Sequence, residues 1–255
     1  MIVVPDGPLH QLGFQTLPIY GPHPHYWVGD VTVSIAPSFG AFRTESPRTA
    51  GKGRSLLIGD PISPDPKLFP RFDFSADEIA RIAERLGSGV TKIMQRDARP
   101  EIWDERSPGD FDIIHFSTHA EANQQSPLDS SIILSPGGGW PGGGDFRLYA
   151  RKIVDVPLHA KLVTLSACRS SGARTYAGEG LVGLAWAFLL AGSRNVVAGL
   201  WNVADETTPQ LMDSFYAGIA KGAEPAEALR DAQRAMLLTE YAKPYYWGPF
   251  QCYRR

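Results

Sequence analysis

Apolar residues along the chain follow two kinds of spacing, and their alternation predicts an α/β protein. From about residue 55 onward, short runs rich in β-branched residues are separated by longer stretches with helical spacing of the apolar positions. Several short runs are apolar at consecutive positions, which is typical of strands covered on both faces. The predicted strands are 55–61, 90–95, 111–119, 130–135 (a short strand or hairpin arm), 161–168, 195–203 and one within 245–253. Strands that alternate with helices predict a mostly parallel sheet with helices on both faces.

The longer stretches between these strands predict helices. They are 76–87, a short helix around 98–106, 178–193, 205–222 and 225–241. Ser75 and Glu78 form a capping-box pattern ahead of the first helix, in which both side chains would bind backbone N–H groups of the first turn. Gly87 and Gly192 stand where the apolar pattern stops, and glycine at that place is typical of a helix end.

Residues 1–54 follow neither pattern and predict a small β-rich addition. They contain short β-prone pieces, MIVVP and WVGDVTVSIAP, which many Gly and Pro residues interrupt. We therefore expect 1–54 to be an N-terminal subregion of the same domain and 55–255 to be its core. The stretch PGGGWPGGGD (136–145) predicts a surface loop, because a phosphate-binding loop would need the pattern GxxxxGK[ST] and a following helix.

The composition is that of a soluble globular protein. The chain has 255 residues, of which 43% are hydrophobic and 20% are charged, which is enough for one sizeable core. A formal net charge of -2 gives no attraction to nucleic acid or to an anionic membrane. No run approaches the ~18 apolar residues of a membrane span, the first residues lack a signal-peptide pattern, and two cysteines make no disulfide framework. We therefore expect a cytoplasmic location and no nucleic-acid or membrane partner.

Two reactive side chains stand where predicted strands end. His119 closes FDIIHFSTH and Cys168 closes KLVTLSAC. Ligands of parallel α/β sheets bind beyond the carboxyl ends of the strands, so the imidazole and the thiol would face one crevice if the two strands are neighbours. An imidazole beside a thiol favours the reactive thiolate, and a histidine roughly 50 residues upstream of the cysteine is the caspase arrangement. Each residue alone has a simpler interpretation, since a cysteine at a strand end is often a small buried hydrophobe and a lone histidine is often structural.

The other candidate sites are weaker. His115 precedes His119 by four residues, but a zinc protease of the HExxH type needs this spacing on a helix with Glu after the first His, and here Phe116 follows in a strand. We therefore expect His115 to pack on the same sheet face as His119. His23 and His25 lie in a Pro-rich surface loop without a third ligand, and the serine-hydrolase pattern GxSxG is missing. The sequence predicts neither a metal nor a cofactor.

At these motifs the chain resembles the CHAT domain, a branch of the caspase–separase clan of cysteine peptidases. IIHFSTHA is similar to the family's histidine motif, HFATHG, and LVTLSACRSS is similar to its cysteine motif, LSACETG. The resemblance continues in PDGPLHQLGFQTL, LLIGDP, the stretch from GEGLVGLAWAFLLAGS to WNVADETTPQLMDSFY, EALRDAQRAML and YYWGPF. It implies an α/β fold, a three-layer caspase-like sandwich with a mostly parallel central sheet.

The resemblance also implies a cysteine endopeptidase, in a regulated signalling or defence role. Cys168 would be the nucleophile, and His119 would be the general acid and base that protonates the leaving amine. The backbone N–H groups of Cys168 and Ala120 would bind the developing oxyanion. The family often has Gly in place of Ala120, and Arg169 replaces the common Glu after the cysteine, a departure that would change local electrostatics or substrate preference.

The family likeness extends to substrate binding. An extended substrate would pair with the edge of GLWNV (199–203), which includes Leu200 and Trp201, by β-augmentation. Asp60, after the first core strand, and Asp205, in WNVADE, would line the primary specificity pocket and favour Arg or Lys before the cleaved bond. Ordinary alternatives are a turn role for Asp60 and a helix N-cap role for Asp205.

Family members usually carry TPR or other helical repeats upstream, which implies regulation from outside the domain. The chain would then be part of a longer protein or answer to a separate TPR-type partner. An alternative function is a catalytically silent CHAT module that binds a protein partner and signals by conformation. A nucleotide-binding α/β protein is a third interpretation, and it lacks a phosphate-loop fingerprint.

Overall fold

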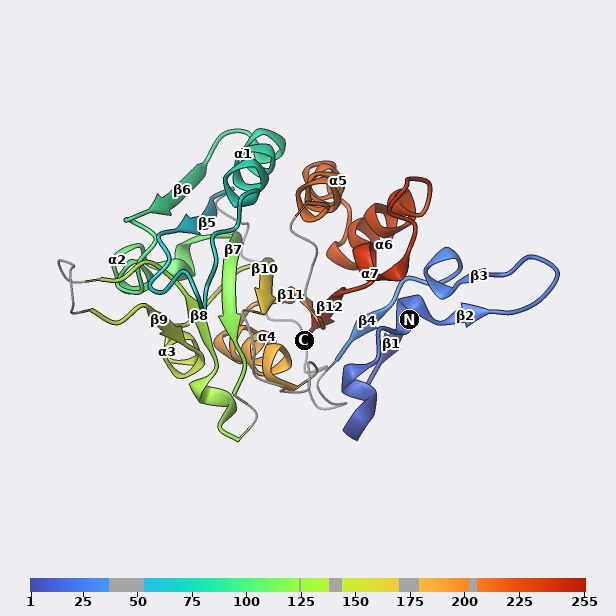
Figure 1. The fold of residues 1–255 in the computed structure, drawn as a ribbon, viewed down its shortest axis with the longest axis horizontal. Coiled ribbons are helices and arrows are strands. Elements are labelled where there is room, and N and C mark those ends of the chain that lie inside the picture. The colour runs from blue at the N-terminus through green and yellow to red at the C-terminus, as the bar shows by residue number, and fades with distance from the viewer. Residues whose placement is uncertain (37–52, 124, 138–143, 170–178, 202–205) are drawn as a thin grey trace.

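A mixed β-sheet forms the centre of the molecule, with helices on both of its faces (Figure 1). The computed structural model describes residues 1–36, 53–123, 125–137, 144–169, 179–201 and 206–255, with the backbone alone at 168–169 and 179–182. Along the sheet the strands follow in the order β1 (Ile2–Val3), β4 (Ser34–Ile35), β12 (Phe250–Arg254), β11 (Asn195–Gly199), β10 (Leu162–Arg169), β7 (Ile113–Glu121), β5 (Ser55–Pro61) and β6 (Val90–Gln95). The five strands from β11 to β6 are mutually parallel, and β12 is antiparallel to β11. The predicted mostly parallel sheet is therefore confirmed.

Shorter strands extend the main sheet or form a separate ribbon. β8 (Ser131–Ile133) pairs antiparallel with the end of β7, and β9 (Arg147–Tyr149) pairs with β8. The alternative of a hairpin arm at 130–135 is thus confirmed. β2 (Pro18–Ile19) and β3 (His25–Tyr26) form a separate ribbon that projects from the body (Figure 1). Because β1 and β4 join the main sheet beside β12, the N-terminal pieces extend the core sheet, and the division at residue 54 stays a prediction.

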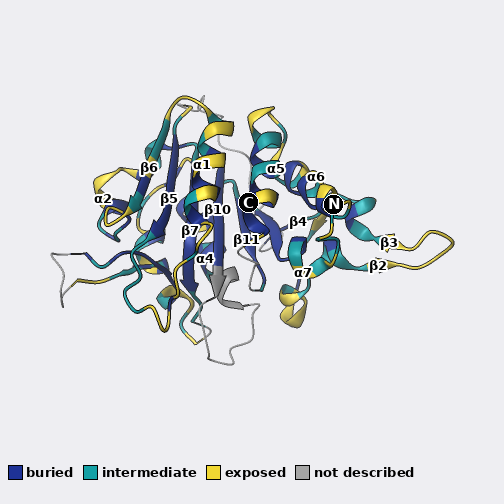
Figure 2. Ribbon diagram, turned by 45° about the horizontal axis from the view of Figure 1, so that its top comes forward, coloured by how far each residue is buried: buried dark blue, intermediate teal, exposed yellow. Residues whose placement is uncertain are grey.

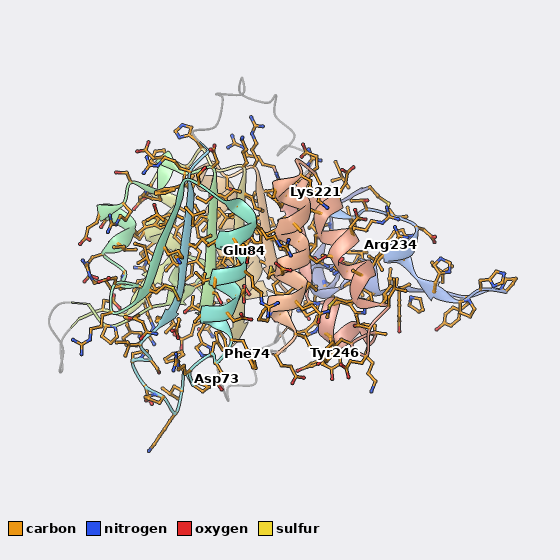
Figure 3. All side chains as sticks on the ribbon, turned by 90° about the horizontal axis from the view of Figure 1, so that it is seen from above. Asp73, Phe74, Glu84, Lys221, Arg234 and Tyr246 are labelled. Atoms are coloured by element: carbon orange, nitrogen blue, oxygen red, sulfur yellow. The ribbon has the colours of Figure 1, made fainter. Side chains whose placement is uncertain are left out.

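Among the residues that the structure describes, three helices cover one face of the sheet and three cover the other. On one face α1 (Ser75–Leu86), α5 (Thr208–Ala220) and α6 (Pro225–Met236) lie side by side (Figure 3). On the other face lie α2 (Ile102–Glu105), α3 (Ala150–Val154) and α4 (Glu179–Ala191). A short helix, α7 (Pro244–Trp247), precedes β12. Within the described ranges no helix has the length and apolarity that a bilayer span requires. The architecture is a three-layer α/β sandwich.

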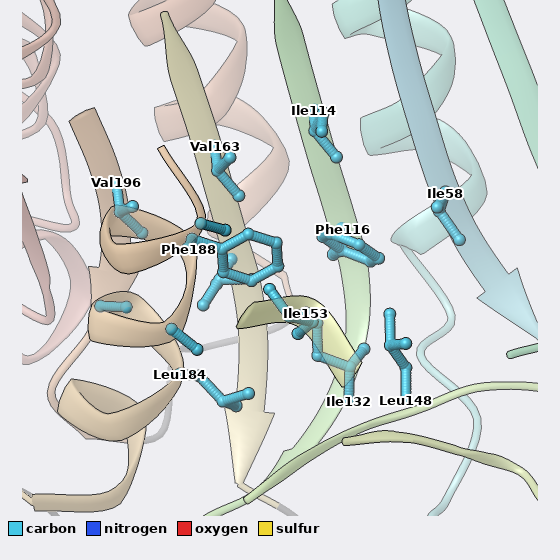
Figure 4. Packing of buried hydrophobic residues seen from close by; sticks show 14 of the residues in the cluster. Ile58, Ile114, Phe116, Ile132, Leu148, Ile153, Val163, Leu184, Phe188 and Val196 are labelled. Carbon is cyan, nitrogen blue, oxygen red and sulfur yellow. The ribbon is translucent and has the colours of Figure 1, made fainter. Parts of the chain in front are cut away.

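Each face of the sheet has its own apolar core, because the central strands are buried on both sides (Figure 2). In one core Phe116 of β7 meets Phe188 of α4 and Ile153 of α3 (Figure 4). In the other core Ile79 and Ile82 of α1 pack with the apolar side of α5. This double burial explains why the central strands are apolar at consecutive positions.

The capping box predicted at Ser75 and Glu78 is wrong. Ser75 is the first residue of α1, and the N-cap before it makes no side-chain hydrogen bond. The Oγ of Ser75 accepts the Asp60 N–H at 2.8 Å and donates to the Ser117 carbonyl at 2.9 Å. Glu78 is buried and faces His115 of β7. Both side chains therefore bind the strands below the helix rather than the helix end.

The strand predicted over 195–203 ends before residue 200, and positions 202–203 of the prediction lie outside the described residues. β11 ends at Gly199, which pairs with Phe250 of β12. The Leu200 N–H still donates to the Pro249 carbonyl at 2.8 Å. Proline has no N–H to return to the partner strand, so the ladder stops there.

Candidate active site

The carboxyl ends of β7 and β10 lie next to each other at one edge of the sheet. The two strands are parallel neighbours, the condition for a shared crevice, and their register pairs Cys168 with His119 and Arg169 with Ala120. Paired residues of neighbouring strands are separated by about 4.8 Å in the hydrogen-bonding direction. The fold therefore brings the two candidate residues, which are far apart along the chain, to adjacent positions.

Backbone and aromatic groups of the loop after β5 hold the His119 imidazole. Its Nε2 lies 2.6 Å from the carbonyl oxygen of Pro70. A carbonyl can only accept, so Nε2 carries the hydrogen, and a neutral imidazole in this tautomer has its lone pair on Nδ1. The Phe72 ring stands over the imidazole with centroids 4.0 Å apart, and Phe69 lies at 5.9 Å. His119 is 7% exposed, so its ring orientation is set by these neighbours.

The role of this loop was missed at the level of sequence. Its residues, FPRFDF (69–74), contain a proline and several aromatic residues, and no motif that would indicate contact with a histidine. The proline disfavours a helix at this point. The hydrogen bond to His119 then uses a backbone carbonyl, a group that every residue has, so no side-chain motif marks it.

A hollow with about 290 Å³ of empty space, part of it open to solvent, lies beside His119. Its wall is mostly apolar and includes Phe69, Phe72 and Ile133, while Asp60 lies at one side. The Asp60 carboxylate is already bound by the Arg71 guanidinium, with Nε–Oδ1 at 3.2 Å and a second contact at 3.3 Å. A basic substrate side chain would therefore meet a carboxylate that already has a cationic partner.

The other predicted substrate and oxyanion residues have different surroundings. Ala120 is buried in β7, between Arg169 of β10 and Ile132 of β8. Leu200 is also buried, and its N–H is engaged by Pro249, so a substrate strand would have to pair with other backbone groups. Asp205 lies outside the described residues. The substrate-binding and oxyanion roles remain predictions.

Trp201 packs against the N-terminal segment and the turn before β12. Its Nε1 donates to the Tyr245 carbonyl at 3.4 Å. A Cβ placed on Gly13 would lie 3.3 Å from the indole, and one on Gly248 would also lie 3.3 Å from it. The two glycines thus leave room for the ring, and the N-terminal segment contacts the start of the 200–206 connection.

We expect Gly248→Ala to destabilise the protein by about 1–3 kcal/mol, because an added methyl overpacks this site. Besides the indole, the methyl would contact the Thr16 side chain and lie 2.7 Å from the Pro244 carbonyl. Urea unfolding followed by tryptophan fluorescence measures the loss. Gly21→Ala is the matched control, because a methyl added there would have nothing within 4 Å and the glycine has no positive φ. Equal stability of the two variants would contradict the prediction.

A buried polar cluster lies below the candidate site, between the sheet and the helices α1 and α5. The His115 Nε2 is 2.9 Å from Glu78 Oε1, and the imidazole Nδ1 is 3.0 Å from the Tyr216 hydroxyl. Tyr216 in turn contacts Thr164 at 2.9 Å, and Ser117 donates to Glu78 Oε2 at 3.2 Å. Complete burial raises the pKa of Tyr216, which keeps its hydroxyl neutral.

His115 therefore does more than the predicted packing, since it pairs with an acid. The sequence held a signal for this partner, because Glu78 stands four residues before Ile82 on the apolar side of α1. Among the described residues, no three His, Cys, Asp or Glu side chains gather in a way that could hold a metal ion. The chemistry available here is that of an imidazole held beside a cysteine position.

Comparison with known proteins adds family and fold. The model of the CHAT domain matches residues 1–255. Tetratricopeptide repeat protein 28 of Mus musculus is 31% identical over 107 residues, which are 42% of this chain and 4% of the relative. The protein of the same name from Homo sapiens is 29% identical over an equal length. The chain thus spans about 4% of the length of these curated relatives.

Two solved structures share the architecture. The Saccharomyces cerevisiae separase–securin complex matches with a TM-score of 0.58 and 13% identity, over 96% of this chain and 14% of that chain. The complex of the pro- and mature domains of Porphyromonas gingivalis RgpB matches with a TM-score of 0.52 and 11% identity, over 79% of this chain and 47% of that chain. At this identity the likeness concerns the fold, and the predicted caspase-like sandwich is confirmed.

Proposed function

Since this chain belongs to the CHAT domain family along residues 1–255, we propose that it is a cysteine endopeptidase that cleaves proteins through His119 and Cys168. The observation that carries the proposal is the register of the two parallel strands, which pairs these residues at the carboxyl edge of the sheet. The hydrogen bond from His119 Nε2 to the Pro70 carbonyl supports it, because that bond leaves Nδ1 as the proton acceptor.

In the proposed reaction the Cys168 sulfur attacks the scissile carbonyl carbon, and His119 Nδ1 takes the thiol proton. Backbone N–H groups of Cys168 and Ala120 stabilise the oxyanion. The same imidazole returns its proton to the leaving amine when the C–N bond breaks. Water then hydrolyses the thioester, again with His119 as the base, and releases the acid.

Regulation by another protein segment fits the same proposal. The curated relatives are named after the tetratricopeptide repeat. Repeats of this kind, in the same chain or in a partner, would control access to the site. We propose a cytoplasmic location, where reducing conditions keep the thiol available.

Thiol labelling tests whether Cys168 is activated. We expect iodoacetamide to modify Cys168 already at pH 6, because a neighbouring imidazolium lowers a thiol pKa to about 3.5–7.5. His119→Ala should slow labelling at this pH about tenfold or more. Cys252 is the internal reference, because its complete burial raises the pKa of that thiol to about 12.

Peptide mapping over a pH series assigns the modified residue, and Cys168→Ala shows the background. Labelling of Cys168 that follows an ordinary thiol pKa and does not change in His119→Ala would contradict the proposal. The chain would then be a catalytically silent CHAT module.

A further inference from the structure

The Asp60 side chain binds both the loop that contacts His119 and the end of β6. Asp60 is 4% exposed and lies at the end of β5. Its two carboxylate oxygens accept hydrogen bonds from the Arg71 guanidinium at 3.2 and 3.3 Å, and Oδ2 also accepts one from the Gln95 side chain. The carboxylate is buried while the Arg71 side chain is 64% exposed. The acid therefore serves as a fixed anchor for a guanidinium that is otherwise in solvent.

The backbone of Asp60 is strained and firmly held. Its φ is +46°, a left-handed conformation that residues other than glycine rarely adopt, and Gln95 has a φ of +53°. The Asp60 N–H donates to Ser75 Oγ, and this hydroxyl donates to the carbonyl of Ser117, two residues before His119 on β7. Strained residues that contact each other beside a candidate active site are typical of positions that hold a functional geometry.

Arg71 stands between two residues that contact the imidazole. Pro70 before it accepts the His119 Nε2–H at 2.6 Å, and the Phe72 ring after it lies 4.0 Å from the imidazole centroid. Because the Asp60 carboxylate fixes the Arg71 side chain, it also restrains Pro70 and Phe72, the residues before and after Arg71. Asp60 is tied to His119 on two sides, through Arg71 and through the hydrogen bonds to β7.

We propose that Asp60 is a positioning residue for His119 rather than a receptor for a basic substrate side chain. Through Arg71, Asp60 keeps residues 70–72 in contact with the imidazole, and the hydrogen bond to the Pro70 carbonyl keeps the hydrogen on Nε2. A lysine or arginine of a substrate would have to displace Arg71, which already provides two hydrogen bonds and the compensating charge. The inference rests on the proposed function for its kinetic consequences, while the effect on the imidazole itself does not depend on catalysis.

The test compares Asp60→Asn with Arg71→Gln. Asparagine tolerates a positive φ, so the first variant removes the charge and keeps the backbone. The second leaves Asp60 in place and changes an exposed side chain, so it remains informative if Asp60→Asn does not fold. Asp77→Asn is the matched control, because it breaks an ion pair with Arg81 on the exposed side of α1.

Two readouts separate the possible outcomes. In a library of peptides that differ only before the cleaved bond, we expect both variants to lower kcat about tenfold for every peptide, the usual cost of removing support for a catalytic group. Nitrogen-15 NMR of the histidines should show the hydrogen of neutral His119 on Nε2 in the unmodified protein and an increased Nδ1–H fraction in both variants.

A loss confined to arginine and lysine peptides, with an unchanged tautomer, would overturn the inference and return Asp60 to a specificity pocket. An unchanged tautomer and unchanged kcat would also overturn it. If the unmodified protein hydrolyses no peptide and its Cys168 is not activated, the proposed function fails. The tautomer shift in Asp60→Asn still decides the positioning role in that case.

Discussion

Replacement of Glu78 by alanine is expected to lower the free energy of unfolding by about 3–5 kcal/mol, because it leaves two buried polar side chains, His115 and Ser117, without their partner. Glu78 Oε1 lies 2.9 Å from His115 Nε2, with side-chain exposures of 5% and 0%. The variant leaves the imidazole without its acid and Ser117 without its acceptor. Neither group can reach water without moving the helix, so the desolvation cost of both remains.

Urea unfolding at pH 7 measures this loss, with Glu84→Ala as control on the same helix. Glu84 lies on the exposed outer side of α1 (Figure 3), where a substitution changes stability by about 0.5 kcal/mol or less. The double variant Glu78→Met/His115→Leu should cost less than Glu78→Ala alone, because it replaces both partners of the buried pair by apolar side chains and leaves neither partner unpaired. If Glu78→Ala lowered the free energy of unfolding no more than Glu84→Ala does, the Glu78–His115 pair would not stabilise the fold.

Glu78 also shows where local sequence reasoning fails. The pattern of Ser75 followed by Glu78 is the same whether the two side chains cap a helix or point into the protein. Their actual partners lie on β7 and at the end of β5, which are distant along the chain. The spacing of Glu78 and Ile82 indicates that the acid lies on the apolar side of α1, but its partner His115 is identified only by the tertiary fold.

The sheet was predictable for a physical reason. Strands such as β7 and β10 are covered on both faces, so their apolar runs are continuous and differ clearly from the helical spacing of α1 or α6. Since parallel strands end at the same edge, the positions of His119 and Cys168 followed once the two strands were taken as neighbours. The end of β11 was less predictable, because it depends on Pro249 in the partner strand.

The surroundings of the site were the least predictable part. The Pro70 carbonyl acts through a backbone atom, and the acid of Asp60 differs from a pocket acid only by the presence of Arg71. Arg71 follows Asp60 by eleven residues in a loop without regular spacing. The family likeness and the negative charge of Asp60 therefore suggested a pocket for basic residues, and the pairing of that charge with Arg71 is known only from the structure.

His119→Ala is expected to lower kcat/KM for peptide hydrolysis by about 10²–10⁴, the usual contribution of a general acid and base. The reason is that the Pro70 carbonyl and the Phe72 ring hold the imidazole beside the Cys168 position, where it would exchange protons with the thiol and the leaving amine. Hydrolysis of a fluorogenic peptide library, in which every amino acid occurs before the cleaved bond, measures the loss. His159→Ala is the control, because this histidine is exposed and its Nδ1 lies 3.3 Å from the Gly109 carbonyl.

Cys168→Ala should reduce hydrolysis to the background rate, and the double variant should be no slower than this single one. When two residues act in the same proton transfer, removing the second residue after the first causes little further loss of rate. If His119→Ala instead retained full activity while Cys168→Ala lost it, another base would serve the thiol. If the double variant were slower than Cys168→Ala by the full factor seen for His119→Ala, the two residues would act independently, and the pairing of their strands would not be the basis of catalysis.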